Sequence, residues 1–250
     1  MLRLAVHLLT LLAAIGCGKP SGPAPAATGA APSKAPTTAP TLFGTVSGKV
    51  TLTGWTPPPP AARMVTCGDH QVPITDQKVV VKNNGLDNVV IYLKNAPPST
   101  TTANLAPALL DQKQCVYVPH VLALRTGQSL MVINNENLLH NVHVLPEFNP
   151  SLNFGMACCG NTHEVVFNKP EIFPAKCDVH PWMMAWIAVF DHPWFAVTSN
   201  GGKFAISHVP AGPQTFVAWH ERFGEIEQTV TITTDQAREI TFNFEPPKEK

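Results

Sequence analysis

CDVHPWMM, at residues 177–184, places a thiol, an imidazole and two thioethers in one short segment. In proteins, two His and one Cys in a trigonal arrangement, with a distant Met on the axis, hold a mononuclear copper ion. Cys177 and His180 can both reach one ion if this segment is a loop that joins two strands. Met183 is then the expected axial ligand, and Met184 is the alternative.

The second imidazole must come from another part of the chain, and His140 is the candidate. It follows a strand-like run that ends in two asparagines, at residues 134–135. His143 lies an odd number of strand positions from His140, so we expect it on the opposite face, as a surface or interface residue; a second metal ligand is the alternative. His120 is expected to be a strand residue with a satisfied hydrogen bond. The predicted ligands of a single copper ion are therefore His140, Cys177, His180 and Met183.

Composition narrows the functional classes. The 250 residues include 17 basic and 17 acidic side chains, so the formal net charge is zero. This balance argues against a nucleic-acid partner. The length allows one large domain or two small ones. With 25 prolines and only 14% charged residues, the chain favours strands and turns over long helices.

The N-terminus has the features of an export signal. One positive charge at Arg3 precedes a short apolar run, which is typical of a secretory signal peptide. Residues 14–17 read AIGC and resemble a bacterial lipobox, whose Cys becomes lipidated. We therefore predict a lipoprotein signal at 1–17 with lipidation at Cys17; an ordinary signal peptide with an incidental Cys is the alternative. Residues 18–42 are rich in Pro and Ala and are expected to form a disordered tether.

Export would place the remaining cysteines where disulfides persist. With Cys17 and Cys177 assigned to lipid and metal, Cys67, Cys115, Cys158 and Cys159 remain, and they allow three pairings. A Cys67–Cys115 bridge is the preferred pairing. The adjacent Cys158 and Cys159 would then form a vicinal disulfide or stay free, and the sequence does not decide between these.

Short alternating runs divided by Gly and Pro turns predict an all-β protein. Residues 46–54, 88–93, 115–124 and 129–135 are examples of such runs. Residues 145–162 are interpreted as a long polar loop. The only suggestion of helix is a turn near residues 105–110.

Residues 104–194 resemble a cupredoxin, the small Greek-key β-sandwich of plastocyanin and amicyanin. The resemblance rests on the strand ending at Asn135, the triplet at residues 140–142, and Cys177 and His180 between the last two strands. The short loop with Met183 three residues after His180 is most similar to that of amicyanin. The resemblance implies one type 1 (blue) copper site, and it implies that Asn141 ties the His strand to the Cys loop by hydrogen bonds.

The flanks, residues 43–98 and 195–245, resemble a carboxypeptidase regulatory-like sandwich, which is prealbumin-like (transthyretin-like). The matching features are SGKV at residues 47–50 and NGGKFAI at residues 200–206, followed by a VPAG turn. Together they predict one discontinuous domain into which the cupredoxin is inserted. The rival interpretation is one enlarged cupredoxin at 43–195 with a C-terminal sandwich after it.

These features predict an exported, membrane-anchored electron carrier in the periplasm or at the cell surface, with the lipid as its only membrane contact and a redox protein as its partner. A copper-storage protein or a non-redox surface scaffold is the alternative. We expect no enzyme, because the chain has neither a Ser/His/Asp pattern nor paired carboxylates. Trp182 is expected to form an apolar collar beside His180, where the partner docks. Met156, near Cys158 and Cys159, is a candidate for a second, soft copper site in that loop, as an addition to the single site predicted above.

Overall fold

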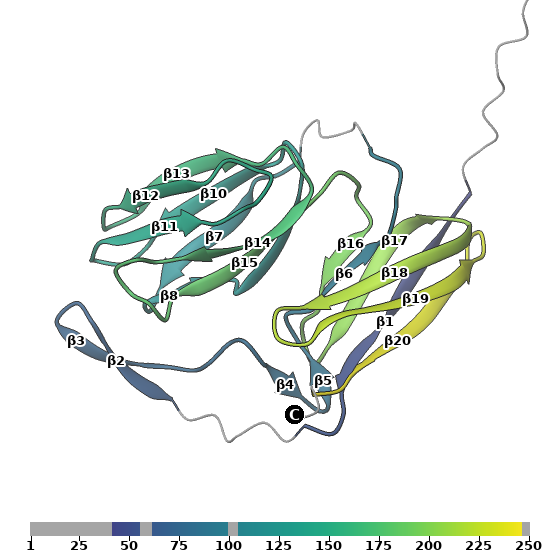
Figure 1. Ribbon diagram of the computed structural model, residues 1–250, viewed down its shortest axis with the longest axis horizontal. Coiled ribbons are helices and arrows are strands. Elements are labelled where there is room, and N and C mark those ends of the chain that lie inside the picture. Colours follow the sequence, from purple (N-terminus) through teal and green to yellow (C-terminus); the bar gives the residue numbers. More distant parts are fainter. Residues whose placement is uncertain (1–41, 56–61, 100–104, 247–250) are drawn as a thin grey trace, which may run out of the picture. The chain divides into compact units, whose positions relative to one another are not determined.

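Two β-sandwiches and one separate hairpin make up the structure, a computed structural model that describes residues 42–55, 62–99 and 105–246 (Figure 1). Within these ranges the chain forms twenty strands and no helix, so the protein is all-β, as predicted. All three parts belong to one compact unit, residues 40–250.

The sandwich that carries the candidate site is built from residues 108–190 and has two sheets. The order of the first sheet is β13-β10-β7-β8, and that of the second is β12-β11-β14-β15-β9. The strands of the first sheet are β7 (Ala108–Lys113), β8 (Val116–Val118), β10 (Ser129–Asn134) and β13 (Asn161–Val166). Those of the second are β9 (Val121–Arg125), β11 (His140–Val144), β12 (Leu152–Met156), β14 (Glu171–Lys176) and β15 (Met184–Phe190).

The core of this sandwich follows from the alternation of apolar residues along its strands. In β10, for example, Leu130, Val132 and Asn134 are buried, and the residues between them are partly exposed. Because side chains alternate between the faces of a strand, the apolar set of each sheet faces the other sheet. Cys177 and Met183 belong to this same core.

The other sandwich combines strands from both ends of the described chain. The order of its first sheet is β17-β1-β5-β4, with β20 also paired to β1, and that of its second sheet is β16-β6-β18-β19. The strands of the first sheet are β1 (Phe43–Leu52), β4 (Val81–Lys82), β5 (Gly85–Leu86), β17 (Lys203–Pro210) and β20 (Ala237–Phe244). Those of the second are β6 (Val90–Leu93), β16 (Phe195–Val197), β18 (Gly212–His220) and β19 (Gly224–Ile232).

Pairing of β1 with both β17 and β20 brings residues about 150 to 190 positions apart into one sheet. The site-bearing sandwich therefore lies, in sequence, between two halves of the other one. The carboxypeptidase regulatory-like character of this outer sandwich stays a prediction.

A small shared core joins the two sandwiches. Val90 of β6 is buried with Val121, Ala188 and Phe190 of the site-bearing sandwich. Beside it, the Glu221 carboxylate accepts hydrogen bonds from a ring nitrogen of His120 and from the Trp186 indole. Burial raises the pKa of Glu221, but these hydrogen bonds outweigh burial and leave it below its usual range. The carboxylate is therefore ionised at neutral pH.

His120 thus has satisfied hydrogen bonds. Its Nδ1 lies 3.1 Å from the carbonyl oxygen of Met184, and its Nε2 faces Glu221.

The hairpin of β2 (Arg63–Cys67) and β3 (His70–Ile74) pairs with no other sheet among the described residues. Its strands pair from Arg63 with Ile74 to Cys67 with His70. A disulfide joins Cys67 to Cys115, which lies between β7 and β8. The hairpin is thereby linked to the site-bearing sandwich.

Two local expectations are wrong. Residues 145–162 are not one long loop, because β12 lies within them and pairs with β11 as an edge strand. Residues 105–110 do not form a helical turn, because β7 begins at Ala108 and pairs in parallel with β10. Both strands are specified by a neighbour in space rather than by a strong local pattern.

The predicted signal peptide at 1–17, with Cys17, lies outside the described residues, as does nearly all of the linker predicted at 18–42. In the ranges that are described, no helix is long and apolar enough to cross a membrane.

The buried side chain of His220 is expected to make the stability of the protein depend on pH. It is 1% exposed and stacks on Phe223, with ring centroids 4.8 Å apart. Burial lowers the pKa of His220 to about 4. In the unfolded state the His220 ring gains its proton near pH 6.5, whereas in the folded state it does so only near pH 4. The unfolded state therefore binds more protons between these two pH values, and the free energy of unfolding decreases as the pH falls from about 6.5 to about 4.

We expect His220 to contribute a loss of roughly 2.5 kcal/mol between pH 7.5 and pH 4.5. His220→Gln keeps an acceptor for the Arg222 backbone N–H, which His220 Nδ1 accepts at 3.1 Å. Urea unfolding of the metal-free protein at the two pH values measures the difference. An equally steep loss in the variant would contradict this assignment.

Candidate metal centre

The predicted ligands come from three adjoining segments. His140 begins β11 and is fully buried. Cys177 directly follows β14 and is 2% exposed, and His180 lies in the loop that leads into β15, where it is 7% exposed. Since β11, β14 and β15 are neighbours in one sheet, their ends bring these side chains together.

The loop has its own hydrogen bonds. The N–H of Cys177 donates to the carbonyl oxygen of Met183 at 3.1 Å, and the N–H of Met183 donates to that of His180 at 2.9 Å. The N–H of His180 donates to Cys177 Sγ at 3.4 Å. This last bond holds the sulfur of Cys177 beside His180.

Two of the distances between donor atoms are close to those expected around one metal ion. Nδ1 of His140 lies 2.9 Å from Nδ1 of His180, and Cys177 Sγ lies 3.8 Å from the latter. An ion bonded at about 2.0 Å to nitrogen and about 2.3 Å to sulfur would separate its donors by roughly 3.3–3.7 Å. The sulfur–nitrogen distance is close to the upper end of this range, and the two nitrogens lie closer together than it.

Electrostatics leave both imidazoles ready to bind a cation. Burial lowers the pKa of His140 to about 4, and the nearby His180 adds to the shift. Burial also lowers the pKa of His180. Both rings are therefore neutral at pH 7. Nε2 of His140 is buried without a hydrogen-bond partner among the described residues, so Nδ1 is the nitrogen that faces the other donors.

Of the two adjacent methionines, Met183 is the better placed. It is fully buried in the same core as Cys177. Met184 is partly exposed and begins β15. Met156 is a further buried thioether in this core, and it lies opposite His140 in the pairing of β11 with β12. Because Cys158 and Cys159 are exposed, Met156 belongs with the core and not with those two thiols.

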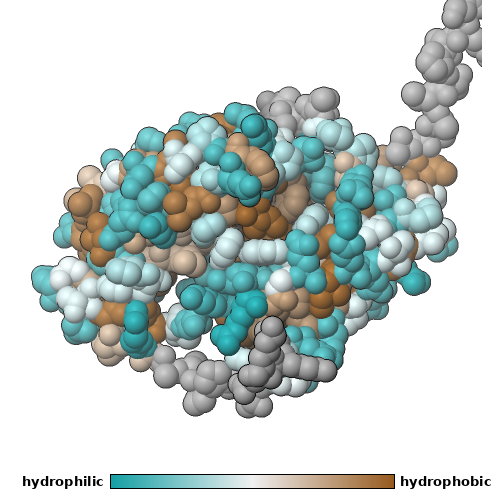
Figure 2. Space-filling view, in the orientation of Figure 1, coloured by the Kyte–Doolittle hydropathy of each residue, from teal (hydrophilic) through white to brown (hydrophobic). Residues whose placement is uncertain are grey.

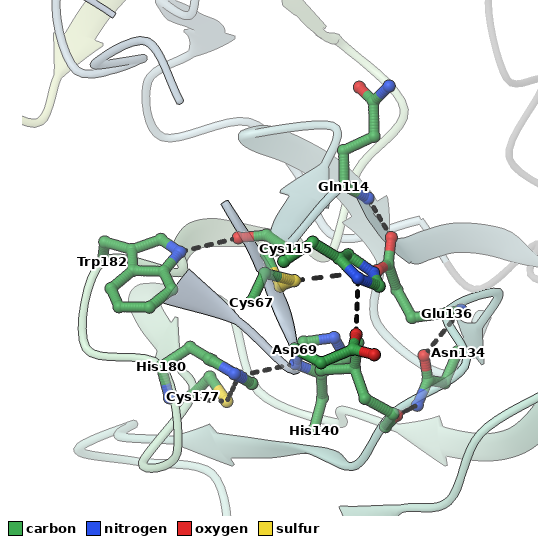
Figure 3. Close-up of a disulfide and its surroundings, with 12 residues drawn as sticks. Cys67, Asp69, Gln114, Cys115, Asn134, Glu136, His140, Cys177, His180 and Trp182 are labelled. Atoms are coloured by element: carbon green, nitrogen blue, oxygen red, sulfur yellow. Dashed lines mark hydrogen bonds and ion pairs between the residues drawn. A yellow bond between two sulfur atoms is a disulfide. The ribbon is translucent and has the colours of Figure 1, made fainter. Parts of the chain in front are cut away.

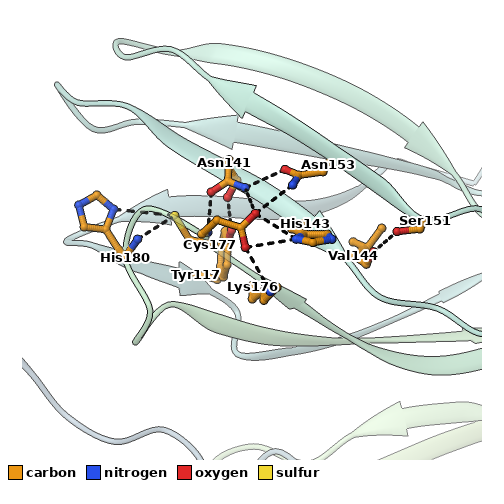
Figure 4. A network of polar contacts seen from close by, with 10 residues as sticks. Tyr117, Asn141, His143, Val144, Ser151, Asn153, Lys176, Cys177 and His180 are labelled. Atoms are coloured by element: carbon orange, nitrogen blue, oxygen red, sulfur yellow. Dashed lines mark hydrogen bonds and ion pairs between the residues drawn. The ribbon is translucent and has the colours of Figure 1, made fainter.

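Asn141 connects the His strand to the Cys loop (Figure 4). Its Oδ1 accepts the N–H of Asp178 at 2.7 Å, and its Nδ2 donates to the Asp178 carboxylate at 3.1 Å and to Asn153 at 2.8 Å. His143, on the same strand face as Asn141, also binds Asp178, at 3.0 Å. The hydrogen bond from His143, aided by those from Asn153, Lys176 and Asn141, holds the pKa of Asp178 well below its usual range.

We expect Asn141→Ala to weaken copper binding by about 10-fold to 100-fold, the usual effect of losing a group that orients metal ligands. Asn153→Ala is the matched control, since it removes the hydrogen bonds of Asn153 with Asp178 and Asn141 but leaves both hydrogen bonds between Asn141 and Asp178. Competition with a chelator of known affinity measures the change. Equal affinities for Asn141→Ala and the wild type would show that this network does not position the ligands.

A second sulfur lies beside the two histidines. Ligand atoms of Cys115, His140 and His180 all lie within 4.8 Å of one another. Cys115 is half of the disulfide with Cys67, and Figure 3 shows this bridge next to the two rings. The sequence did not predict that the bridge adjoins the site.

Trp182 lies between the loop and the hairpin. Its ring centroid is 5.2 Å from that of His180, its indole N–H donates to the Cys115 carbonyl at 2.9 Å, and the Arg63 guanidinium lies 6.0 Å from its ring. Trp182 is therefore next to His180, as expected. It also contacts the hairpin side of the site, so it is not simply a rim residue that faces solvent.

The comparisons with known proteins reveal a likeness to solved cupredoxin structures. A copper-containing nitrite reductase from Thermus scotoductus is similar at 20% identity with a TM-score of 0.32, over 37% of this chain and 25% of that one. A mutant of amicyanin with Cu(I) is similar at 17% identity with a TM-score of 0.31, over 40% of this chain and 97% of that one. A purple cupredoxin from Nitrosopumilus maritimus is similar at 19% identity with a TM-score of 0.28, over 33% of this chain and 98% of that one. No family model and no curated protein matches.

Proposed function

We propose that this chain is a type 1 copper protein that carries single electrons between redox partners, exported and held at the membrane by lipid on Cys17. His140, Cys177, His180 and Met183 would hold the copper ion. The observation that carries the proposal is the buried Cys177 thiol 3.8 Å from His180 Nδ1, whose ring faces His140 Nδ1 at 2.9 Å.

The donor set suits copper. Soft thiolate and imidazole ligands favour Cu(I) and still accommodate Cu(II). Copper held by such a set supplies one-electron oxidation and reduction. Hydrogen bonds of the chain would hold the donors in one arrangement in both the oxidised and the reduced state. Cys177 and His180 lie in one hydrogen-bonded loop, and Asn141 ties that loop to the strand that carries His140. Little rearrangement is then needed when the charge changes.

Exposed apolar residues flank the ligands in sequence and support a docking surface for a redox protein. Leu139 precedes His140 and is 57% exposed, and Val179 precedes His180 and is 50% exposed. Across the face seen in Figure 2, hydrophobic residues are interspersed with hydrophilic ones. Together with a formal net charge of zero, this surface favours a partner recognised by apolar contact more than by charge steering.

Redox titration tests electron transfer directly. The copper-loaded protein should follow a one-electron Nernst curve and should be reduced and reoxidised repeatedly without loss of metal. Cys177→Ala, in which the thiolate is absent, is the matched control. Release of copper in either oxidation state, or a curve that does not retrace, would contradict a carrier.

One observation favours the alternative of copper storage. His180 is only 7% exposed, and the disulfide of the hairpin adjoins its ring. A covered ligand slows electron exchange and also slows metal loss. Under the storage alternative the protein holds Cu(I) tightly but exchanges electrons slowly with a small soluble oxidant, which the same titration would reveal as poor reversibility.

A further inference from the structure

We propose that the Cys67–Cys115 pair, once reduced by a dithiol, is a second soft-metal site that binds Cu(I) together with the two histidines, His140 and His180. In this site the Cys115 thiolate joins His140 and His180, and Cys67 supplies a further thiolate. The inference shares the histidines of the proposed copper centre but does not depend on Cys177.

Proximity is the first support. In the structure, Cys115 is the cysteine whose sulfur forms a compact trio with ring nitrogens of His140 and His180, all within 4.8 Å and all three residues buried. A second group, Cys67, Cys115 and Glu136, meets the same distance limit. Two sets of potential ligands therefore converge on Cys115 (Figure 3). Thiolate and imidazole are the ligands that Cu(I) prefers.

Backbone geometry is the second support. Gln114 and Cys115 have φ angles of 55° and 54°, and neither is a Gly, Asn or Asp. Left-handed backbone is unfavourable for such residues and persists only where the surroundings hold it in place. Here the carboxylate of Glu136 accepts the Gln114 N–H and also lies 4.0 Å from Cys67 Sγ. The turn thus holds Cys115 against the histidines.

Backbone pairing does not hold the hairpin to another sheet among the described residues, because its two strands pair only with each other. Met64 is 56% exposed, whereas Val65 is buried. Besides the disulfide, Arg63 lies over Trp182, Gly68 lies near Leu138 and Cys67 Sγ lies 4.0 Å from the Glu136 carboxylate. Opening the S–S bond therefore leaves side-chain contacts as the links between the hairpin and the sandwich.

The chemistry balances with a dithiol as the reductant. The S–S bond accepts two electrons and two protons, Cys67 and Cys115 become thiols, and the dithiol becomes a disulfide. Each thiol that then binds Cu(I) releases its proton to solvent. Reoxidation of the pair by a disulfide would remove both thiolates. The two histidines would then be available to the copper centre that contains Cys177.

Cu(I) affinity, measured in both states of the bridge, tests the inference. The variant is the full chain with serine at Cys17, Cys158, Cys159 and Cys177, so that only the Cys67–Cys115 pair remains. A phosphine reductant opens the bridge, and a thiol reagent verifies that two thiols are present. Competition with a colorimetric Cu(I) chelator should show one Cu(I) bound about 100-fold more tightly, or better, after reduction, since losing even an orienting group costs 10–100-fold.

Two further substitutions in that variant identify the ligands. Cys115→Ser, which cannot form the bridge, should bind Cu(I) far more weakly than the reduced pair does, and His140→Ala should weaken binding by the reduced form. Circular dichroism of each form verifies the fold. Equal Cu(I) affinity before and after verified reduction would overturn the proposal, and so would a gain that is insensitive to His140→Ala. Because Cys177 is absent throughout, failure here is distinct from failure of the electron-carrier proposal.

Discussion

Replacing Cys177 with serine is expected to abolish the intense visible absorption of the Cu(II)-loaded protein. That absorption arises from charge transfer between a thiolate and copper, and Cys177 is the buried free thiol beside His180. Serine keeps the size of the side chain but supplies a hard oxygen, which Cu(I) binds poorly. Optical spectra of the two proteins at equal copper concentration measure the effect.

Cys158→Ser is the matched control, because it removes an exposed thiol from another loop. Its spectrum should equal that of the wild type. An intense band that survives in Cys177→Ser would place the coloured site elsewhere, and loss of the band in Cys158→Ser would implicate the exposed pair.

A large loss of stability is expected from Gly48→Ala. Gly48 lies in β1 between β17 and β20, where it pairs with Phe204 and Ile240. A Cβ at this position would overlap the carbonyl oxygen of Ile240, a backbone atom of the strand that pairs with β1 from Thr45 to Leu52. The sheet must therefore separate, which we expect to cost about 3 kcal/mol or more.

Gly224→Ala is the control, since its φ is 76° and a Cβ there meets nothing within 4 Å. It tests left-handed strain without overlap and should cost roughly 1–2 kcal/mol. Urea unfolding of the metal-free proteins gives both values. A Gly48→Ala protein as stable as the Gly224→Ala protein would show that β1 does not hold the two strands this tightly.

Much of the candidate site was predictable from the sequence because the chemistry lies in short motifs. The segment at residues 177–184 carries two donors three positions apart, and its flanking apolar runs indicate strands. His140 and Asn141 follow a strand-like run, so their approach to the loop was expected. The structure places His140 and His180 in contact and joins Asn141 to the loop through Asp178.

The hairpin over the site could not be predicted in the same way. Residues 63–74 show only a weak alternation, and their closeness to the histidines depends on the link from Cys67 to Cys115, two residues 48 positions apart. The Cys67–Cys115 pairing was preferred on sequence grounds, but its position beside His140 and His180 is a tertiary property. The burial of His180 was likewise not evident from the loop itself.

The edge strand β12 and the parallel strand β7 escaped prediction for a related reason. In residues 152–156, partly exposed and fully exposed side chains alternate, and only Met156 is buried. This pattern lacks the buried apolar face of a typical strand, so the segment was predicted as a loop. β7 pairs in parallel with β10, which begins sixteen residues after β7 ends. Such pairings are decided by partners distant in sequence, which local propensity does not capture.

Titration of the metal-free protein with Cu(II), followed by optical spectroscopy, tests the copper site most directly. We predict an intense visible band that grows to one equivalent of copper, disappears on reduction with ascorbate and returns on oxidation. A protein that stays colourless with one equivalent of Cu(II), or that binds Zn(II) in preference without developing a reversible band, would contradict a His140–Cys177–His180 copper centre.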